Sequence, residues 1–158
     1  MGSVSVNLTV NGKVVRAEVP ADTSLVTFLR EHQRLTGTHV GCDTAQCGAC
    51  TIHVNGQAVK SCNMLVAQAA GMNITTIEGM AAANGDMHPM QAAFKECHGL
   101  QCGYCTPGMV MSACELAGKM VNPSDDEIRA ALDGNICRCT GYQNIVKSVK
   151  TGLAAMNA

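Results

Sequence analysis

Large aromatic side chains are scarce in this sequence, which has no tryptophan, two phenylalanines and two tyrosines among 158 residues. Such residues usually anchor the core of a small domain. The chain is nevertheless 47% hydrophobic and 15% charged, so we expect it to fold rather than remain disordered. Because two domains of about 70–80 residues would be marginal on apolar burial alone, the composition predicts that further cross-links stabilise the fold.

Charge bias and long apolar runs are also missing. The formal net charge is −1 and there is no basic block, which argues against nucleic-acid binding. No apolar run approaches the length of about 20 residues that a membrane-spanning helix needs. The first thirty residues alternate polar and apolar positions, without the apolar segment of a signal peptide. We therefore expect a cytoplasmic protein with no transmembrane segment.

Two hairpins dominate the first half of the chain. Residues 4–10 alternate apolar and polar side chains, and Asn11-Gly12 is a strong hairpin signal before a return strand over 13–19. A second hairpin turns at Asn55-Gly56, and a further strand is expected over 73–77. Between the hairpins, one short helix is expected, carrying Leu25, Phe28 and Leu29 and capped by Asp22 or Thr23.

Beyond about residue 80 the pattern becomes helical, and residues 79–87 are the expected connection. Four helices joined by short loops predict a small bundle. The expected helix signals are a cap at His88 or Asp86 before Pro89, a stop at Gly99, a start at Thr106-Pro107, a capping box Ser124-x-x-Glu127 with a stop at Gly134, and a last helix from about Tyr142.

Cysteine is abundant, with ten residues, and in the cytosol clustered cysteines are more often metal-binding or catalytic than disulfide-bonded. A secreted disulfide scaffold is therefore disfavoured. The first group has the spacing C-x4-C-x2-C, with a fourth cysteine after eleven more residues, as in plant-type [2Fe–2S] ferredoxins. Zinc sites favour paired C-x2-C knuckles instead. The expected ligands of this first cluster are Cys42, Cys47, Cys50 and Cys62.

The glycines beside these ligands have an expected role. Gly41 and Gly48 should permit the unusual backbone angles and the close N–H···S approaches that a loop around a cluster needs.

The second group comprises Cys102, Cys105, Cys137 and Cys139, each pair placed at the start of an expected helix. Two helix N-termini aimed at one point would favour thiolates and an anionic cluster. On spacing alone this group could equally bind zinc, whereas a thioredoxin-like dithiol is disfavoured because no βαβ unit precedes it.

Two cysteines, Cys97 and Cys114, lie outside both groups on apolar helix stripes and are expected to be buried small hydrophobes. None of the five histidines is expected to be a ligand, including His98 beside the second group. Arg138, between two expected ligands, is either solvated or tunes the cluster through its charge. Tyr104 and Tyr142 either shield the second site from water or simply pack.

Three stretches, "VGCDTAQCGACTIHVNG", "HGLQCGYCTPGM" and "GNICRCTGYQNIVKSV", resemble the iron–sulfur subunit of the molybdenum hydroxylases, the xanthine oxidase family. The resemblance covers about residues 3–155 and includes all eight cysteines of the two groups. Within the family, "GCDTAQCGAC", "KSCNMLVAQA" and "ITTIEGMA" most resemble the small subunit of aerobic carbon monoxide dehydrogenase. Similar small subunits also serve nicotine, quinoline, caffeine and aldehyde dehydrogenases.

The resemblance implies an α+β chain with a β-grasp ferredoxin domain over 1–79 and a four-helix bundle over 80–158, each holding one [2Fe–2S] cluster. It also implies a large subunit with molybdopterin, in its cytosine dinucleotide form, and a medium subunit with FAD. These would assemble as a dimer of heterotrimers, cytoplasmic or held peripherally at the inner membrane through the complex. Electrons would pass from molybdenum through both clusters to FAD, with no catalytic residue on this chain.

The family pattern further implies that Gln101 and the ligand Cys139 contact the pterin, since an amide offers a heterocycle both a donor and an acceptor. Two other functions remain open. One is a free-standing two-cluster ferredoxin, although diffusing ferredoxins usually carry a strongly charged docking face. The other is a zinc-stapled interaction module. The substrate, carbon monoxide or an aldehyde, purine or N-heterocycle, would bind on another chain.

Overall fold

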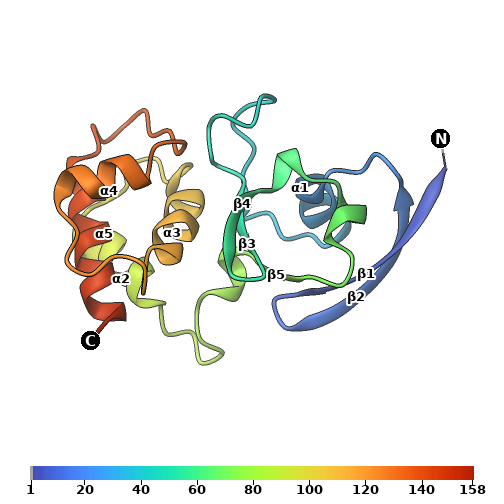
Figure 1. Cartoon of the computed structure of the whole chain (residues 1–158), viewed down its shortest axis with the longest axis horizontal. Coiled ribbons are helices and arrows are strands. Elements are labelled where there is room, and N and C mark those ends of the chain that lie inside the picture. Colours follow the sequence, from blue (N-terminus) through green and yellow to red (C-terminus); the bar gives the residue numbers. More distant parts are fainter. Residues whose placement is uncertain (1) are drawn as a thin grey trace.

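The computed structural model describes residues 2–158, so Met1, the first residue of the expected N-terminal domain, lies outside the described residues. A sheet-containing half and a helical half lie side by side, with the N-terminus at one end of the molecule and the C-terminus at the other (Figure 1). The expected α+β fold class is confirmed. The domain boundary at residues 79 and 80 stays a prediction.

The sheet has five strands in the order β2-β1-β5-β3-β4, the order of a β-grasp domain. Within it, β1 pairs antiparallel with β2 and parallel with β5, while β3 pairs antiparallel with both β5 and β4. The fifth strand is shorter than the expected 73–77. The strands are β1 Ser3–Val10, β2 Lys13–Pro20, β3 Thr51–Val54, β4 Gln57–Lys60 and β5 Asn73–Thr75.

Both expected hairpin turns are confirmed, since Asn11 and Gly12 have φ of 47° and 78°, and Asn55 and Gly56 have φ of 50° and 83°. Two successive positive φ angles give the turn whose twist matches paired strands. The remaining short elements of this half are η2 Ser61–Asn63, η3 Val66–Ala69 and η4 Ile77–Gly79.

The short helix that covers the sheet is α1, Leu25–Thr27, which continues as one π-helical segment, η1, Phe28–His32. Its N-cap is Ser24, whose hydroxyl accepts a hydrogen bond from Thr27 N–H. The expected caps Asp22 and Thr23 were therefore wrong. Leu25, Phe28 and Leu29 are fully buried against the strands, as the apolar spacing predicted.

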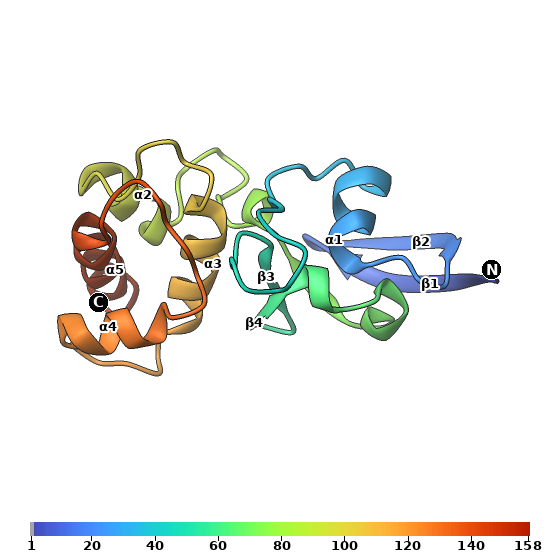
Figure 2. The ribbon, with the colours of Figure 1, turned by 90° about the horizontal axis from the view of Figure 1, so that it is seen from above.

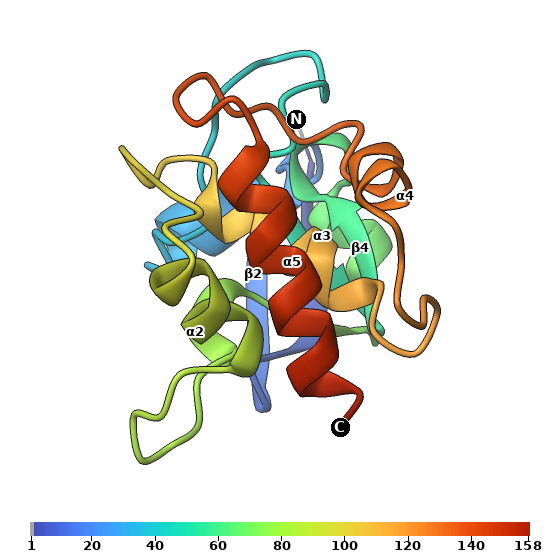
Figure 3. The ribbon, with the colours of Figure 1, turned by 90° about the vertical axis from the view of Figure 1, so that its left-hand side faces the viewer.

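The helical half consists of four helices. Helix α5 packs between α2 and α4, with α3 on the side that faces the sheet (Figures 2 and 3). The caps at His88 and Ser124 are confirmed, and Glu127 completes the expected capping box. The helices are α2 Pro89–Glu96, α3 Thr106–Glu115, α4 Asp125–Ala131 and α5 Gln143–Met156.

The end of α2 differs from expectation. The residue that adopts left-handed backbone is His98, with φ of 54°, and not Gly99. Gly99 is instead needed for space, because a Cβ there would collide with the Ser148 side chain and would lie 2.9 Å from a ring carbon of Phe94. Cys97 is only half-buried, so its expected burial was wrong, whereas the burial of Cys114 is confirmed.

The two halves meet where α3 packs against β3 and β4. His53 of β3 contributes to this contact, since its Nε2 lies 2.7 Å from the Met111 carbonyl oxygen and donates a hydrogen bond to it. Within residues 2–158, no helix combines the length and apolarity that crossing a bilayer would require.

Candidate metal centres

The first site is built by the loop before β3 and by the end of the second hairpin. Cys42, Cys47 and Cys50 come from the loop, and Cys62 comes from η2. Cys47 N–H donates a hydrogen bond to the Cys42 sulfur, and the Cys47 and Cys42 thiols, like those of Cys50 and Cys62, lie close enough to shift the pKa of their neighbour. Cys62 also lies within electrostatic range of the other two thiols. The structure therefore brings the first expected quartet together, as two pairs.

The two expected loop glycines serve this site differently. Gly48 has φ of 72°, in the left-handed region that favours glycine. Gly41 lies outside that region, and a Cβ there would sit 3.2 Å from the Cys47 sulfur, so it provides space. Ala45, with φ of 57°, is a left-handed position that the sequence did not reveal.

Backbone donors give the thiols of this site unequal acidity. Cys47 N–H points at the Cys42 sulfur at 3.4 Å. This N–H and that of Thr44 lower the pKa of Cys42 to about 6, because hydrogen bonds favour the charged form. Burial, reinforced by Cys50, raises the pKa of Cys62 to about 11. The loop thus already presents N–H groups to a thiolate, which suits an anionic cluster.

The second site lies between the starts of two helices. Cys105 is the N-cap of α3, with Cys102 in the loop before it, and Cys137 and Cys139 precede α5. The Cys139 and Cys102 sulfurs are 3.4 Å apart, and the Cys105 and Cys137 thiols lie close enough to shift each other's pKa. The second quartet is therefore also two pairs, each joining the two chain segments.

The surroundings of the second site favour negative charge on some thiols and burial of others. Tyr104 N–H points at the Cys102 sulfur at 3.5 Å, and α3, whose N-cap is Cys105, adds a positive dipole end. Burial raises the pKa of Cys105 to about 12. Burial opposes ionisation of Cys137 as well, but hydrogen bonds from Thr140 and nearby backbone outweigh it and lower the pKa.

The paired arrangement indicates which metal group each quartet suits. A zinc ion needs four ligands converging on one point. A [2Fe–2S] cluster instead has two irons and four thiolates, which two separate thiol pairs can supply. Both quartets therefore fit a [2Fe–2S] cluster.

The two sites are neighbours. A cavity of about 190 Å³ is lined by residues of both, including Cys47 and Ala49 of the first loop and Cys105 and Cys137 of the second site. The backbones approach so closely that a Cβ on Gly108 of α3 would collide with the Gly48 carbonyl oxygen. Glycine at position 108, which has no Cβ, therefore allows α3 to lie this close to the first loop.

Several residues at this junction carried no recognisable signal in the sequence. His39 stacks on Tyr104 with ring centroids 4.5 Å apart, and its Nδ1 lies 2.7 Å from the Tyr104 carbonyl oxygen. The Tyr104 hydroxyl donates to the Val40 carbonyl at 2.8 Å. Asn135 is buried between the sites. Because buried amides need hydrogen-bond partners, the burial of Asn135 indicates a structural role at this junction.

Of the remaining expected site residues, Gln101 and Arg138 are both exposed beside the second quartet. Gln101 precedes Cys102 on the surface of the molecule, next to the most exposed thiols, Cys102 and Cys139. Its expected contact with a pterin stays a prediction.

Comparison with known proteins agrees with this geometry. A family model described as "2Fe-2S iron-sulfur cluster binding domain" matches residues 8–73, and one described as "[2Fe-2S] binding domain" matches residues 76–150. The chain belongs to the two-cluster iron–sulfur subunits of the molybdenum hydroxylase family. It thus binds two [2Fe–2S] clusters.

Individual relatives span nearly the whole chain. Caffeine dehydrogenase subunit gamma of Pseudomonas sp. (strain CBB1) is 48% identical, covering 96% of this chain and 92% of that one. The nicotine 6-hydroxylase small subunit of Paenarthrobacter nicotinovorans is 47% identical, covering 92% and 87%. The structure of quinoline 2-oxidoreductase from Pseudomonas putida 86 superposes with a TM-score of 0.92 at 37% identity, covering 98% and 96%.

These relatives correct one expectation from the sequence. The short stretches that resembled the carbon monoxide dehydrogenase small subunit are outweighed by similarity over at least 90% of this chain to subunits named for caffeine, nicotine and aldehydes. The chain is an iron–sulfur electron-transfer subunit of a molybdenum-dependent oxidoreductase, and carbon monoxide as the substrate is not specifically supported.

Proposed function

We propose that this chain serves a molybdenum hydroxylase that oxidises an N-heterocycle, a purine or an aldehyde. The similarity to subunits named for caffeine, nicotine and quinoline supports the first two classes, and that to the PaoA subunit of aldehyde oxidoreductase, 42% identical, supports the third. The substrate binds on another chain, so no residue of this one touches it. Carbon monoxide remains the weaker candidate.

The eight cysteines are the proposed cluster ligands. Their pairing across each site is the single observation that carries this assignment, because two thiol pairs match the demand of two irons. When bound, each cluster supplies a one-electron carrier. The chain's own residues hold it and donate N–H groups to its thiolates. The proposed ligand sets are Cys42, Cys47, Cys50 and Cys62 for the first cluster, and Cys102, Cys105, Cys137 and Cys139 for the second.

The exposure of the second site sets the proposed direction of electron flow. Cys102 and Cys139 are exposed, and so is Gln101 beside them. We assign this face to the molybdopterin of a large subunit, in its cytosine dinucleotide form, with Gln101 and Cys139 contacting the pterin. The first site then faces FAD on a medium subunit. Electrons enter at the second quartet and leave at the first, in a complex proposed to be a dimer of heterotrimers.

Substitution of single ligands tests the assignment. In the purified complex, Cys102→Ser should remove one of two [2Fe–2S] electron paramagnetic resonance (EPR) signals and leave the other, whereas Cys47→Ser should do the converse. Cys97→Ala is the matched control, since this half-buried cysteine lies outside both quartets and both signals should persist. Loss of both signals in either ligand variant, or of neither, would contradict the two quartets.

Isolation of the complex tests the partners and the substrate class. Flavin and molybdenum subunits should copurify with the native chain, and isolation of the chain alone would favour a free-standing ferredoxin. A colourless zinc protein without acid-labile sulfide would contradict electron transfer altogether. Reduction of the complex should be compared with purines, N-heterocycles, aldehydes and carbon monoxide. Reduction by carbon monoxide alone would overturn the proposed substrate class.

A further inference from the structure

A short stretch of backbone, residues 135–137, connects the two quartets. Ile136 N–H donates a hydrogen bond to the Cys47 carbonyl oxygen at 2.9 Å, and Cys137 follows Ile136 directly in the chain. From the Cys47 sulfur to the Cys137 sulfur, the route therefore follows covalent bonds except at that single hydrogen bond. Both cysteines belong to the proposed ligand sets, one in each.

Asn135 fixes this stretch to the first loop. Its side chain is 8% exposed. Its Nδ2 donates to the Gly48 carbonyl oxygen at 3.1 Å, and its Oδ1 accepts from the Ser112 hydroxyl at 2.8 Å. The buried amide is thus satisfied at both ends by groups from two other elements, the first loop and α3. Its geometry leaves little freedom to the backbone that precedes Ile136.

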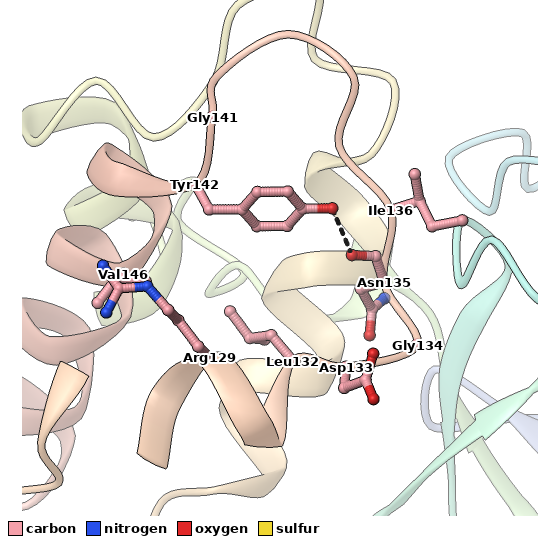
Figure 4. Close-up of a pocket in the computed structure, with 9 residues that line it drawn as sticks. All are labelled: Arg129, Leu132, Asp133, Gly134, Asn135, Ile136, Gly141, Tyr142 and Val146. Atoms are coloured by element: carbon pink, nitrogen blue, oxygen red, sulfur yellow. Dashed lines mark hydrogen bonds between the residues drawn. The ribbon is translucent and has the colours of Figure 1, made fainter. Parts of the chain in front are cut away.

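Tyr142 fixes the same stretch from the other side. Its hydroxyl accepts a hydrogen bond from Cys137 N–H at 2.8 Å and donates one to the Asn135 carbonyl oxygen at 3.3 Å. In Figure 4 the ring reaches across a cavity of about 350 Å³ to meet Asn135. Tyr142 does so from a backbone φ of 68°, which non-glycine residues adopt rarely. One hydroxyl therefore holds both ends of residues 135–137.

We propose that residues 135–137 are the junction through which an electron passes between the two clusters, and that Asn135 and Tyr142 are its positioning residues. The proposal rests on the proposed function, which assigns Cys47 and Cys137 to different clusters. In this step one electron leaves the second site, which is oxidised by one electron, and the first site is reduced by one. No bond is made or broken and no proton moves.

A second contact between the sites provides the competing route. Tyr104, next to the proposed ligand Cys105, donates its hydroxyl to the carbonyl of Val40, two residues before Cys42. That route runs through the whole Tyr104 side chain, and this residue is 50% exposed. Its hydrogen bond ends at Val40, which is not itself next to a proposed ligand. Tyr104→Phe and Tyr142→Phe are therefore matched changes: each removes one hydroxyl beside the second quartet, on different routes.

The test measures magnetic coupling in the holocomplex reduced fully with sodium dithionite. When both clusters are paramagnetic, each splits the EPR signal of the other, and the splitting shrinks as their separation grows. Tyr142→Phe and Asn135→Ala should each reduce the splitting, Asn135→Ala more strongly, with both signals and the full iron content retained. Tyr104→Phe should leave the splitting as in the parent, and so should Asn157→Ala, the same side-chain truncation at the exposed end of α5.

Each other result decides against the junction. Parent-like splitting in both Tyr142→Phe and Asn135→Ala would overturn it while leaving the cluster assignment intact. A reduced splitting in Tyr104→Phe alone would show that the His39–Tyr104 contact, and not residues 135–137, positions the two sites, and would overturn the proposal. A parent complex without two [2Fe–2S] signals would overturn the proposed function itself, and the junction with it. Because a general loss of stability would deplete the signals rather than their splitting, folding defects are distinguishable.

Discussion

Gly108→Ala is the sharpest test of how the two halves dock. Gly108 is buried inside helix α3, where alanine has a higher helix propensity than glycine by about 1 kcal/mol. On helix propensity alone the substitution should therefore stabilise the protein. The added Cβ, however, would lie closer than 3.0 Å to the Gly48 carbonyl oxygen and 3.2 Å from two atoms of Ala49.

The cost of this collision follows from which atoms must move. Ordinary contact begins at 3.4 Å, and the added Cβ would lie closer than 3.0 Å to the Gly48 carbonyl oxygen. Helix α3 and the first loop must therefore separate by more than 0.4 Å. The obstacle is backbone and has no rotamer that relieves it. Overpacking of this kind costs about 1–3 kcal/mol. After subtracting the propensity gain of about 1 kcal/mol, the variant should be destabilised by about 0–2 kcal/mol.

Gly152→Ala is the matched control for this prediction. Gly152 lies inside α5, and a Cβ there would collide with the Met90 sulfur, approach its methyl at 2.8 Å and lie 3.2 Å from its backbone Cα, the one part that cannot move aside as a side chain does. Methionine has several rotatable bonds and adapts to such a collision, so Gly152→Ala should be less destabilising than Gly108→Ala. The assay is urea unfolding of the cluster-loaded protein, followed by far-ultraviolet and visible circular dichroism. A Gly108→Ala variant about 1 kcal/mol more stable than the parent, the pure propensity result, would refute the close approach.

Three further predictions concern single elements. Ser124→Ala removes the N-cap of α4 and should cost about 1 kcal/mol in urea unfolding, whereas an unchanged midpoint would contradict the cap. Phe94→Ala opens the helical core and should cost about 3–5 kcal/mol; the second EPR signal should be depleted before the first, and equal depletion would contradict separate cores. Burial raises the pKa of Cys114 from 9.0 to about 12, so its contribution to stability is full below pH 9 and is lost as the pH rises toward 12. Urea unfolding at pH 8 and pH 10 should therefore show a smaller loss of stability in Cys114→Ala than in the parent, and equal losses would contradict the burial of a neutral thiol.

Local signals in the sequence predicted the local structure well. Asn-Gly pairs predicted both hairpins, because that dipeptide tolerates two successive positive φ angles. The box at Ser124 and Glu127 predicted the start of α4, because its hydrogen bonds lie within four residues. Cysteine spacing and the expected helix starts sorted eight cysteines into two groups, and the structure brings each group together. Their role as cluster ligands stays a prediction.

Contacts between distant segments were not predictable in the same way. The cap of α1 was misplaced by one or two residues because Ser24, Thr23 and Asp22 are all capable N-caps, and only the path of the chain chooses among them. Gly99 was taken for a left-handed stop, yet it makes room for Ser148, half a domain away in sequence. The roles of Asn135 and His39 depend on how the halves dock, which no local pattern records.

The pairing of thiols shows what spacing cannot provide. The C-x-x-C at Cys102 and Cys105 looks like a unit, and either a dithiol or a zinc knuckle would use both sulfurs together. In the structure the two belong to different pairs, Cys102 with Cys139 and Cys105 with Cys137. Each pair joins a cysteine from the segment that leads into α3 to one from the loop between α4 and α5. The second site therefore forms only when these two segments meet. The same loop places Ile136 against Cys47, so the segment that supplies Cys137 and Cys139 to the second site also contacts the first site.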